Sequence, residues 1–166
     1  MSLLIQLCLF AAIVALVLAA IHDLAVRTVP NELITAVGAC ALGLAALQHR
    51  LLISLAIASL LMVLTFILWT RGYLGGGDGK LLAICALLVA PGNVFPMLLA
   101  TALAGGLLCL PYLPGRHIFS RPAPTRPDGL LARLLRCEHW RLRRRGPLPY
   151  AVAIAAGTLS ALLHGV

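Results

Sequence analysis

The sequence predicts an all-α membrane protein, a polytopic bundle of about six transmembrane helices. Hydrophobic residues make up 61% of its 166 residues, whereas a soluble domain is closer to half apolar. Several apolar runs approach the roughly 20 residues that a helix needs to cross a bilayer. The alternation of apolar and polar residues that is typical of a membrane β-strand is absent.

The apolar runs place six spans in a single domain that covers residues 1–166. The first run lacks the basic residues that open a signal peptide, so we expect it to be retained as a span. Helices are the expected element because lipid-facing backbone must satisfy its own hydrogen bonds. The predicted spans are Leu3–Ile21, Leu33–Leu47, Leu51–Trp69, Lys80–Ala90, Val94–Leu113 and Leu148–Leu163.

The fourth span is unusually short. From Asp78 to Ala90 there are 13 residues, which make about 20 Å of helix against a hydrocarbon core of about 30 Å. The sequence PGN at residues 91–93 then interrupts the apolar run, because proline and glycine end helices. Two arrangements remain open: a short fourth helix followed by a fifth, or one broken span over residues 80–113.

The distribution of basic residues favours six spans over five, because lysine and arginine gather in cytoplasmic loops. With six spans, 12 of the 13 basic residues lie on one side of the membrane, and only Arg50 lies on the other. With five spans, the nine arginines between residues 114 and 147 would face away from Arg27, Arg71 and Lys80. The six-span arrangement predicts that both termini lie outside.

The basic cytoplasmic loop at residues 114–147 contains a predicted amphipathic helix. In LLARLLRCEHWRLRRR, residues 130–145, leucines fall on one helical face, and Arg133, Arg136 and Arg143 fall on the opposite face. A basic amphipathic helix of this kind lies on an anionic membrane surface. We favour lipid as its partner over nucleic acid, which would need a basic face turned away from the membrane.

Two of the five acidic residues are candidates for chemistry. Asp23 follows the first span, and Asp78 follows three glycines at the start of the fourth. Ordinary explanations exist, because Asp23 can pair with Arg27 four residues later and Asp78 can cap a helix. The six-span topology, however, places both acids on the cytoplasmic side at similar depth. Two converging carboxylates share one proton, so one can accept a proton from water while the other donates to a carbonyl.

Three motifs, in this order along the chain, resemble those of the type IV prepilin peptidases. DLAVRTVPNEL, residues 23–33, resembles the first motif, with Arg27, Pro30 and Asn31 at matching positions. GGGDGKLLA, residues 75–83, resembles the second, which contains the GxGD sequence of intramembrane aspartyl proteases and a lysine, here Lys80. LPYAVAIAAGTL, residues 148–159, resembles the last span. The chain is similar to the short form that accompanies Flp-type pili and other tight-adherence systems.

The resemblance implies an aspartic endopeptidase of the bacterial inner membrane, with Asp23 and Asp78 as the catalytic pair. Its substrates would be prepilins and pseudopilins, which are cut at the cytoplasmic face where a basic leader joins a hydrophobic helix. Pilus-assembly machinery is a further expected partner. The longer family members also N-methylate the new terminus, with an extra domain that carries paired CxxC motifs. The five cysteines here form no such pair, so we expect no methyltransferase activity, no cofactor and no metal site.

Several positions have a supporting or uncertain role. We expect Gly75 and Gly77 to let the backbone approach the substrate or the other aspartate, with a flexible interfacial loop as the alternative. Lys80 either tunes the carboxylate pair or reaches lipid phosphate. Arg27 either pairs with Asp23 or follows the positive-inside bias.

Two positions depart from the family pattern. Gly79 stands where a β-branched residue is common, and Ala151 stands where a glycine usually follows the tyrosine. We expect neither to touch a proton-transfer group. We also expect no couple between His22 and Asp23, because sequence neighbours on a helix point apart.

Two other functions remain open. A small ion-transporter component would also use intramembrane acids and a broken helix, but it gives the three motifs no role. A non-catalytic assembly subunit of a pilus or secretion system would keep the motifs without the chemistry.

Overall fold

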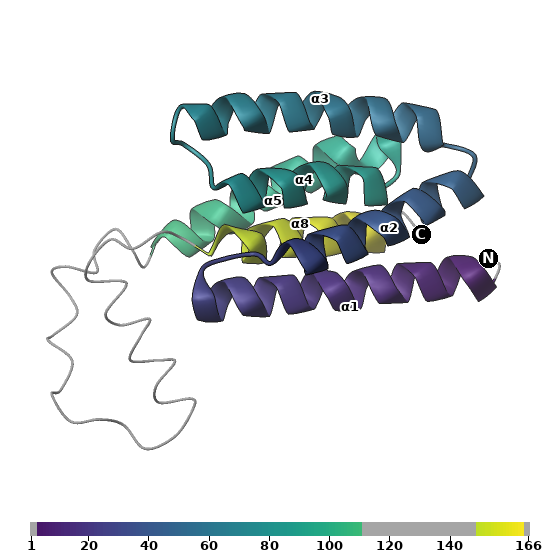
Figure 1. Ribbon diagram of the computed structural model, residues 1–166, viewed down its shortest axis with the longest axis horizontal. Helices are drawn as coiled ribbons and strands as arrows, with labels where there is room; N and C mark the ends of the chain where they lie inside the picture. Colours follow the sequence, from purple (N-terminus) through teal and green to yellow (C-terminus); the bar gives the residue numbers. More distant parts are fainter. Residues whose placement is uncertain (1–2, 111–148, 165–166) are drawn as a thin grey trace, which may run out of the picture.

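A computed structural model describes residues 3–110 and 149–164 (Figure 1). All regular structure in these two segments is helical, which confirms the predicted all-α class for them. The predicted amphipathic helix, with Arg133, Arg136 and Arg143, lies outside the described residues. The helices are α1 (Leu3–Val26), α2 (Asn31–Leu47), α3 (Leu51–Thr70), α4 (Gly76–Leu88), α5 (Val94–Cys109) and α8 (Tyr150–His164), with a 3-10 turn, η1 (Pro91–Asn93), between α4 and α5.

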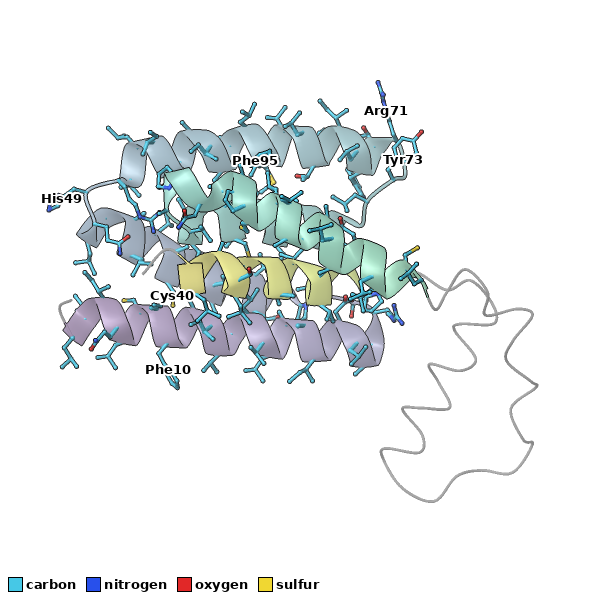
Figure 2. All side chains as sticks on the ribbon, turned by 180° about the vertical axis from the view of Figure 1, so that it is seen from behind. Phe10, Cys40, His49, Arg71, Tyr73 and Phe95 are labelled. Atoms are coloured by element: carbon cyan, nitrogen blue, oxygen red, sulfur yellow. The ribbon has the colours of Figure 1, made fainter. Side chains whose placement is uncertain are left out.

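The helices run side by side, with α3 along one edge of the bundle and α1 along the other (Figure 1). Three segments are long and apolar enough to cross a membrane: α1, α3 and the unit Pro91–Cys109. Two shorter helices, α2 and α8, are also apolar. Side chains such as Phe10 and Phe95 point outward (Figure 2), as expected where lipid rather than water surrounds a bundle.

Helix α4 is the central element of the bundle. It packs against α2, α3 and α8, and seven of its 13 residues are buried. Helix α3, by contrast, buries only Ser54 and Thr65. This difference follows from position, because both helices are mostly apolar and only α4 is enclosed by neighbours.

The structure describes two separate helices, α4 and α5, in the part of residues 80–113 that ends at residue 110. Helix α4 ends at Leu88, and Pro91 occupies the first turn of η1 before α5 begins at Val94. Proline suits this position because the first residues of a helix have no partner for an N–H group. Helix α4 therefore begins four residues before the predicted span at 80–90, at Gly76, and ends two residues before the predicted end.

The C-terminal end of α4 is closed by a side chain from another part of the fold. Arg50, which precedes α3, donates from Nη1 to the carbonyls of Leu87 (3.2 Å) and Val89 (2.7 Å) and from Nη2 to Leu88 (2.8 Å). A helix leaves its last carbonyls unpaired, and lipid cannot satisfy them. The guanidinium of Arg50 therefore makes it possible for such a short helix to end inside the bundle.

The first helix is longer than predicted. It continues to Val26 rather than Ile21, so Asp23 lies in its last turn. It ends where Arg27 adopts a left-handed conformation, with φ of 63°, shortly before Pro30, whose ring disfavours helix in the preceding residue. His22 donates from Nδ1 to the carbonyl of Thr28 at 2.7 Å, which braces this turn.

Helices α5 and α8 cross closely at Gly157. A Cβ atom at Gly157 would overlap the Oγ1 of Thr101 and lie 2.8 Å from the Met97 carbonyl oxygen. Small residues allow helices to approach closely in membranes. This crossing fixes the position of α8, whose N-terminal end lies at the site described next.

Candidate active site

A cavity of about 910 Å³ lies at the end of the bundle where α1 ends and α4 begins. Arg71 and Tyr73 mark this end in Figure 2, with His49 at the opposite end. The cavity is bounded by the last turn of α1, by the connections between α1 and α2 and between α3 and α4, and by Tyr150 of α8. Its lining includes both candidate acids, Asp23 and Asp78, which are 55 positions apart in the sequence.

Asp23 lies deep in the wall of this cavity. Only 4% of its surface is exposed, and its Oδ2 accepts a hydrogen bond of 3.1 Å from the backbone N–H of Ala151. Ala151 is the second residue of α8, so this N–H is one of those that a helix start leaves unpaired. The carboxylate of α1 therefore caps a helix that begins 127 positions later in the sequence.

Asp78 approaches the same cavity from the other side. It is the third residue of α4, behind the N-cap Gly75, and it is half-buried. A Cβ atom at Gly75 would lie 2.5 Å from the Asp78 Oδ2. The absent side chain at Gly75 therefore provides the space that the carboxylate occupies.

The electrostatic environment shows that the two carboxylates interact. Asp78 precedes the apolar part of α4, and the pKa of its carboxyl is raised to about 6 by two causes. Burial is the larger cause, and the negative charge of Asp23 is the second. Burial and a like charge both disfavour the charged form of an acid, so Asp78 keeps its proton to a higher pH than an ordinary aspartate does.

The three glycines before Asp78 are not equivalent. Gly75 borders the carboxylate, whereas a Cβ at Gly76 would lie 3.2 Å from the Trp69 indole nitrogen. A Cβ at Gly77 would make only ordinary contacts, at 3.6 Å from Val29 Cβ. The steric need for glycine at the start of α4 is therefore greatest at Gly75.

The other predicted supporting residues lie around the same space. Arg27, Asn31, Gly77 and Lys80 line the cavity. Pro30 does not line it but is the N-cap residue of α2, and its carbonyl accepts hydrogen bonds from the N–H groups of Leu33 (3.2 Å) and Ile34 (3.3 Å).

Two contributions of α8 to the site were not identified from the sequence. Tyr150 lines the cavity, and Ala151 holds Asp23 through its N–H. The prediction that Ala151 touches no proton-transfer group is therefore wrong, because α8 packs with its N-terminal end against the last turn of α1. The motif LPYAVAIAAGTL contains both residues, but only the tertiary packing shows which backbone group reaches the acid.

Gly79, the second departure from the family pattern, faces away from the acids. A Cβ at Gly79 would lie 3.1 Å from the Cβ of Thr65 on α3, and the Thr65 hydroxyl donates a long hydrogen bond of 3.4 Å to the Gly79 carbonyl. Thr65 thus fills the place that a larger residue at position 79 would need. The contact supports packing between α3 and α4.

An apolar crevice of about 320 Å³ adjoins the cavity between α3 and α4. It shares Gly76 and Lys80 with the cavity, and Met62, Phe66 and Trp69 provide most of its apolar wall. In the described residues, no group of three or more histidine, cysteine, aspartate or glutamate side chains could hold a metal ion.

Comparison with known proteins identifies the family. Neither a search of curated proteins nor a search of solved structures gives a significant match. The model of the type IV leader peptidase family matches residues 10–110, which is more than half of the chain. This range includes both candidate acids, the cavity loops and the glycine-rich start of α4. The chain therefore belongs to the type IV leader peptidase family.

Proposed function

We propose that this protein is an aspartic endopeptidase that removes the leader from Flp-type prepilins and pseudopilins, with Asp23 and Asp78 as its catalytic pair. One observation carries the proposal: two acids that are distant in the sequence line one cavity, and the charge of one acts on the other. Membership of a leader peptidase family supports the class of reaction.

The chemistry needs one proton shared between two carboxyl groups. The ionised carboxylate takes a proton from a water molecule, whose oxygen bonds to the scissile carbonyl carbon. The protonated carboxyl donates its proton to the carbonyl oxygen, which gives a tetrahedral diol. When the C–N bond breaks, the leaving nitrogen receives the proton that came from water, and the second carboxyl recovers its own. The net change is the addition of one water across the peptide bond.

The membrane placement follows from the same proposal. The cavity would face the cytoplasm, with both termini outside the inner membrane, because Arg27 and Arg71, from two of the described connections, lie at the cavity end (Figure 2). A prepilin leader is basic and cytoplasmic, so it would reach this end of the bundle without crossing the lipid. Pilus-assembly proteins and anionic lipid are the other proposed partners. We propose no N-methyltransferase activity and no cofactor, because the sequence lacks paired CxxC motifs.

Leader cleavage in cells tests the proposal directly. The chain is co-expressed with an Flp-type prepilin in cells that lack other prepilin peptidases, and cleavage is followed as a gel shift. We expect Asp23→Asn and Asp78→Asn each to abolish cleavage at unchanged membrane abundance. Glu32→Gln is the matched control, because Glu32 is an exposed acid at the start of α2, outside the cavity lining, and its loss leaves cleavage intact.

The alternatives predict other results. If cleavage survives either aspartate substitution, the catalytic pair is wrong. If the wild type cleaves none of a panel of prepilins, a non-catalytic assembly subunit becomes the better explanation. Proton or cation flux into vesicles that contain the purified protein, abolished by the same substitutions, would favour the transporter.

A further inference from the structure

The two carboxylates of the cavity are held in different ways. Asp23 is almost completely buried, and the N–H of Ala151 donates to its Oδ2 at 3.1 Å. A hydrogen bond from an N–H group to a carboxylate is strongest when the carboxylate is charged. The start of α8 also carries the positive end of the helix dipole, which favours a negative charge at this place.

Asp78 has no such donor. Among the residues that the structure describes, no group donates a hydrogen bond to its carboxylate, and a Cβ at Gly75 would lie 2.5 Å from its Oδ2. Its position in the first turn of α4 favours its charge, as the first turn of α8 does for Asp23. The two helix starts therefore offset one another, and the N–H of Ala151 distinguishes the two acids.

The remaining charged and titratable groups of the cavity do not reverse this difference. Arg27 from the end of α1 and Lys80 from α4 line the same space, as do Tyr73 and Tyr150. Both cations favour the ionised form of either carboxyl. Burial alone would favour a proton on the deeper acid, Asp23, and its donor from α8 opposes that tendency.

We propose that the carboxylates have fixed, different roles: Asp23, held by the N–H of Ala151, is the general base, and Asp78 carries the proton. Ala151 is then a positioning residue, which acts on the reaction only through Asp23. This assignment rests on the proposed function for its catalytic meaning. In each turnover the proton from water goes to Asp23, and the scissile carbonyl oxygen takes its proton from Asp78.

The location of the proton is measurable without any substrate. The chain has only five acidic side chains, so infrared difference spectroscopy of the purified protein can follow the C=O stretch of protonated carboxyl groups during a pH titration. We expect a band that titrates near pH 6. It should disappear in Asp78→Asn and remain in Asp23→Asn, with a lower midpoint because the neighbouring charge is gone.

Two infrared results would overturn this assignment of roles. A band that disappears in Asp23→Asn and remains in Asp78→Asn would reverse the roles. A band that both variants lose would show one proton shared without a fixed owner, which also overturns the assignment. Because no cleavage is measured, these results stand whether or not the protein proves to be a peptidase, whereas failure of the proposed function shows as loss of wild-type cleavage.

The role of Ala151 has its own test. Ala151→Pro removes the N–H, and the first turn of a helix tolerates proline because its N–H groups are not used within the helix. Ala151→Gly is the control, since it keeps the donor. We expect the acid limb of the cleavage profile to move up by roughly one pH unit in Ala151→Pro relative to Ala151→Gly, because the charged form of Asp23 loses a donor.

A packing defect would give a different result. Proline restricts the preceding Tyr150, so Ala151→Pro can lower the rate at every pH. A lower rate with an unmoved acid limb would assign Ala151 a structural role only and would refute the positioning claim. If Ala151→Pro fails to accumulate in the membrane, the infrared titration of the two aspartate variants decides the assignment.

Discussion

The two ends of α4 differ in how their surroundings are filled. At its C-terminal end, the guanidinium of Arg50 binds three backbone carbonyls and fills the space around them. At its N-terminal end, Gly75 has no side chain, and the Asp78 carboxylate occupies the space that a side chain there would need. The C-terminal end is therefore fixed by several hydrogen bonds, whereas the N-terminal end leaves space for a side chain. The comparison shows how a short helix can be fixed in place while it presents a reactive group.

The largest effect on stability is expected at the Arg50 end of α4. We expect Arg50→Met to destabilise the protein by about 3 kcal/mol or more, because removing a charged donor leaves buried carbonyls unsatisfied. Arg50→Lys should recover only part of this loss, since an ammonium cannot reproduce the planar fork of a guanidinium. The measurement is the midpoint of unfolding of the purified protein in detergent. Arg71→Met, at an exposed position, is the control and should leave the midpoint unchanged.

At the glycine end, the larger effect falls on activity rather than on stability. A methyl group in Gly75→Ala would push the Asp78 carboxylate aside, and a displaced catalytic group costs on the order of 100-fold in rate. The clash is with the end of a mobile side chain, so unfolding should change little. Gly43→Ala, where a Cβ would meet nothing within 4 Å, is the control for both measurements.

Gly77→Ala tests whether the effect of Gly75→Ala on cleavage comes from the space beside Asp78. Its Cβ would make ordinary contacts only, so its loss of cleavage should be smaller than that of Gly75→Ala. Equal losses in the two variants would mean that backbone freedom, rather than the space beside Asp78, is what the loop requires.

The smallest effect expected is on the pH dependence of stability. The pKa of Asp78 is raised from 3.8 in the unfolded chain to about 6 in the folded protein, so the folded state binds the proton more tightly. The stability that this proton provides is present below pH 4 and is lost as the pH rises to 6. We therefore expect the unfolding midpoint of wild type to fall across this window relative to Asp78→Asn. Parallel curves for the two proteins would show that the folded state does not raise this pKa.

The sequence allows accurate prediction of the helices and less accurate prediction of their ends. Hydrophobic runs locate α2 and α3 within a few residues, because the membrane imposes one length scale on every span. The PGN break likewise locates the boundary between α4 and α5. The end of α1 is missed by five residues, since Ile21 to Val26 contains no helix breaker and the stop is set by Pro30 and the conformation of Arg27. Nothing local in the sequence shows that Arg50 reaches the end of α4.

Some features of the candidate site could likewise be predicted from the sequence, and others could not. Asp23 and Asp78 could be selected because acids are rare in this chain and occur in motifs with glycine and proline. The donor from Ala151 could not be predicted, because a backbone N–H has no signature in the sequence and its partner lies 128 positions away. The separate importance of Gly75 among three consecutive glycines is likewise a matter of distances that only the folded chain provides.

The hydrogen bonds between Arg50 and the end of α4 also make the length of the helix determine where Asp78 lies. From Leu88 to Asp78 the helix measures about 15 Å, at about 1.5 Å per residue. The position of the Asp78 carboxylate along the bundle is therefore set from the Arg50 end of α4, and not by the loop that precedes the helix. Inserting one residue between these points would turn the acid by about 100° and move it by about 1.5 Å, away from its partner on α1.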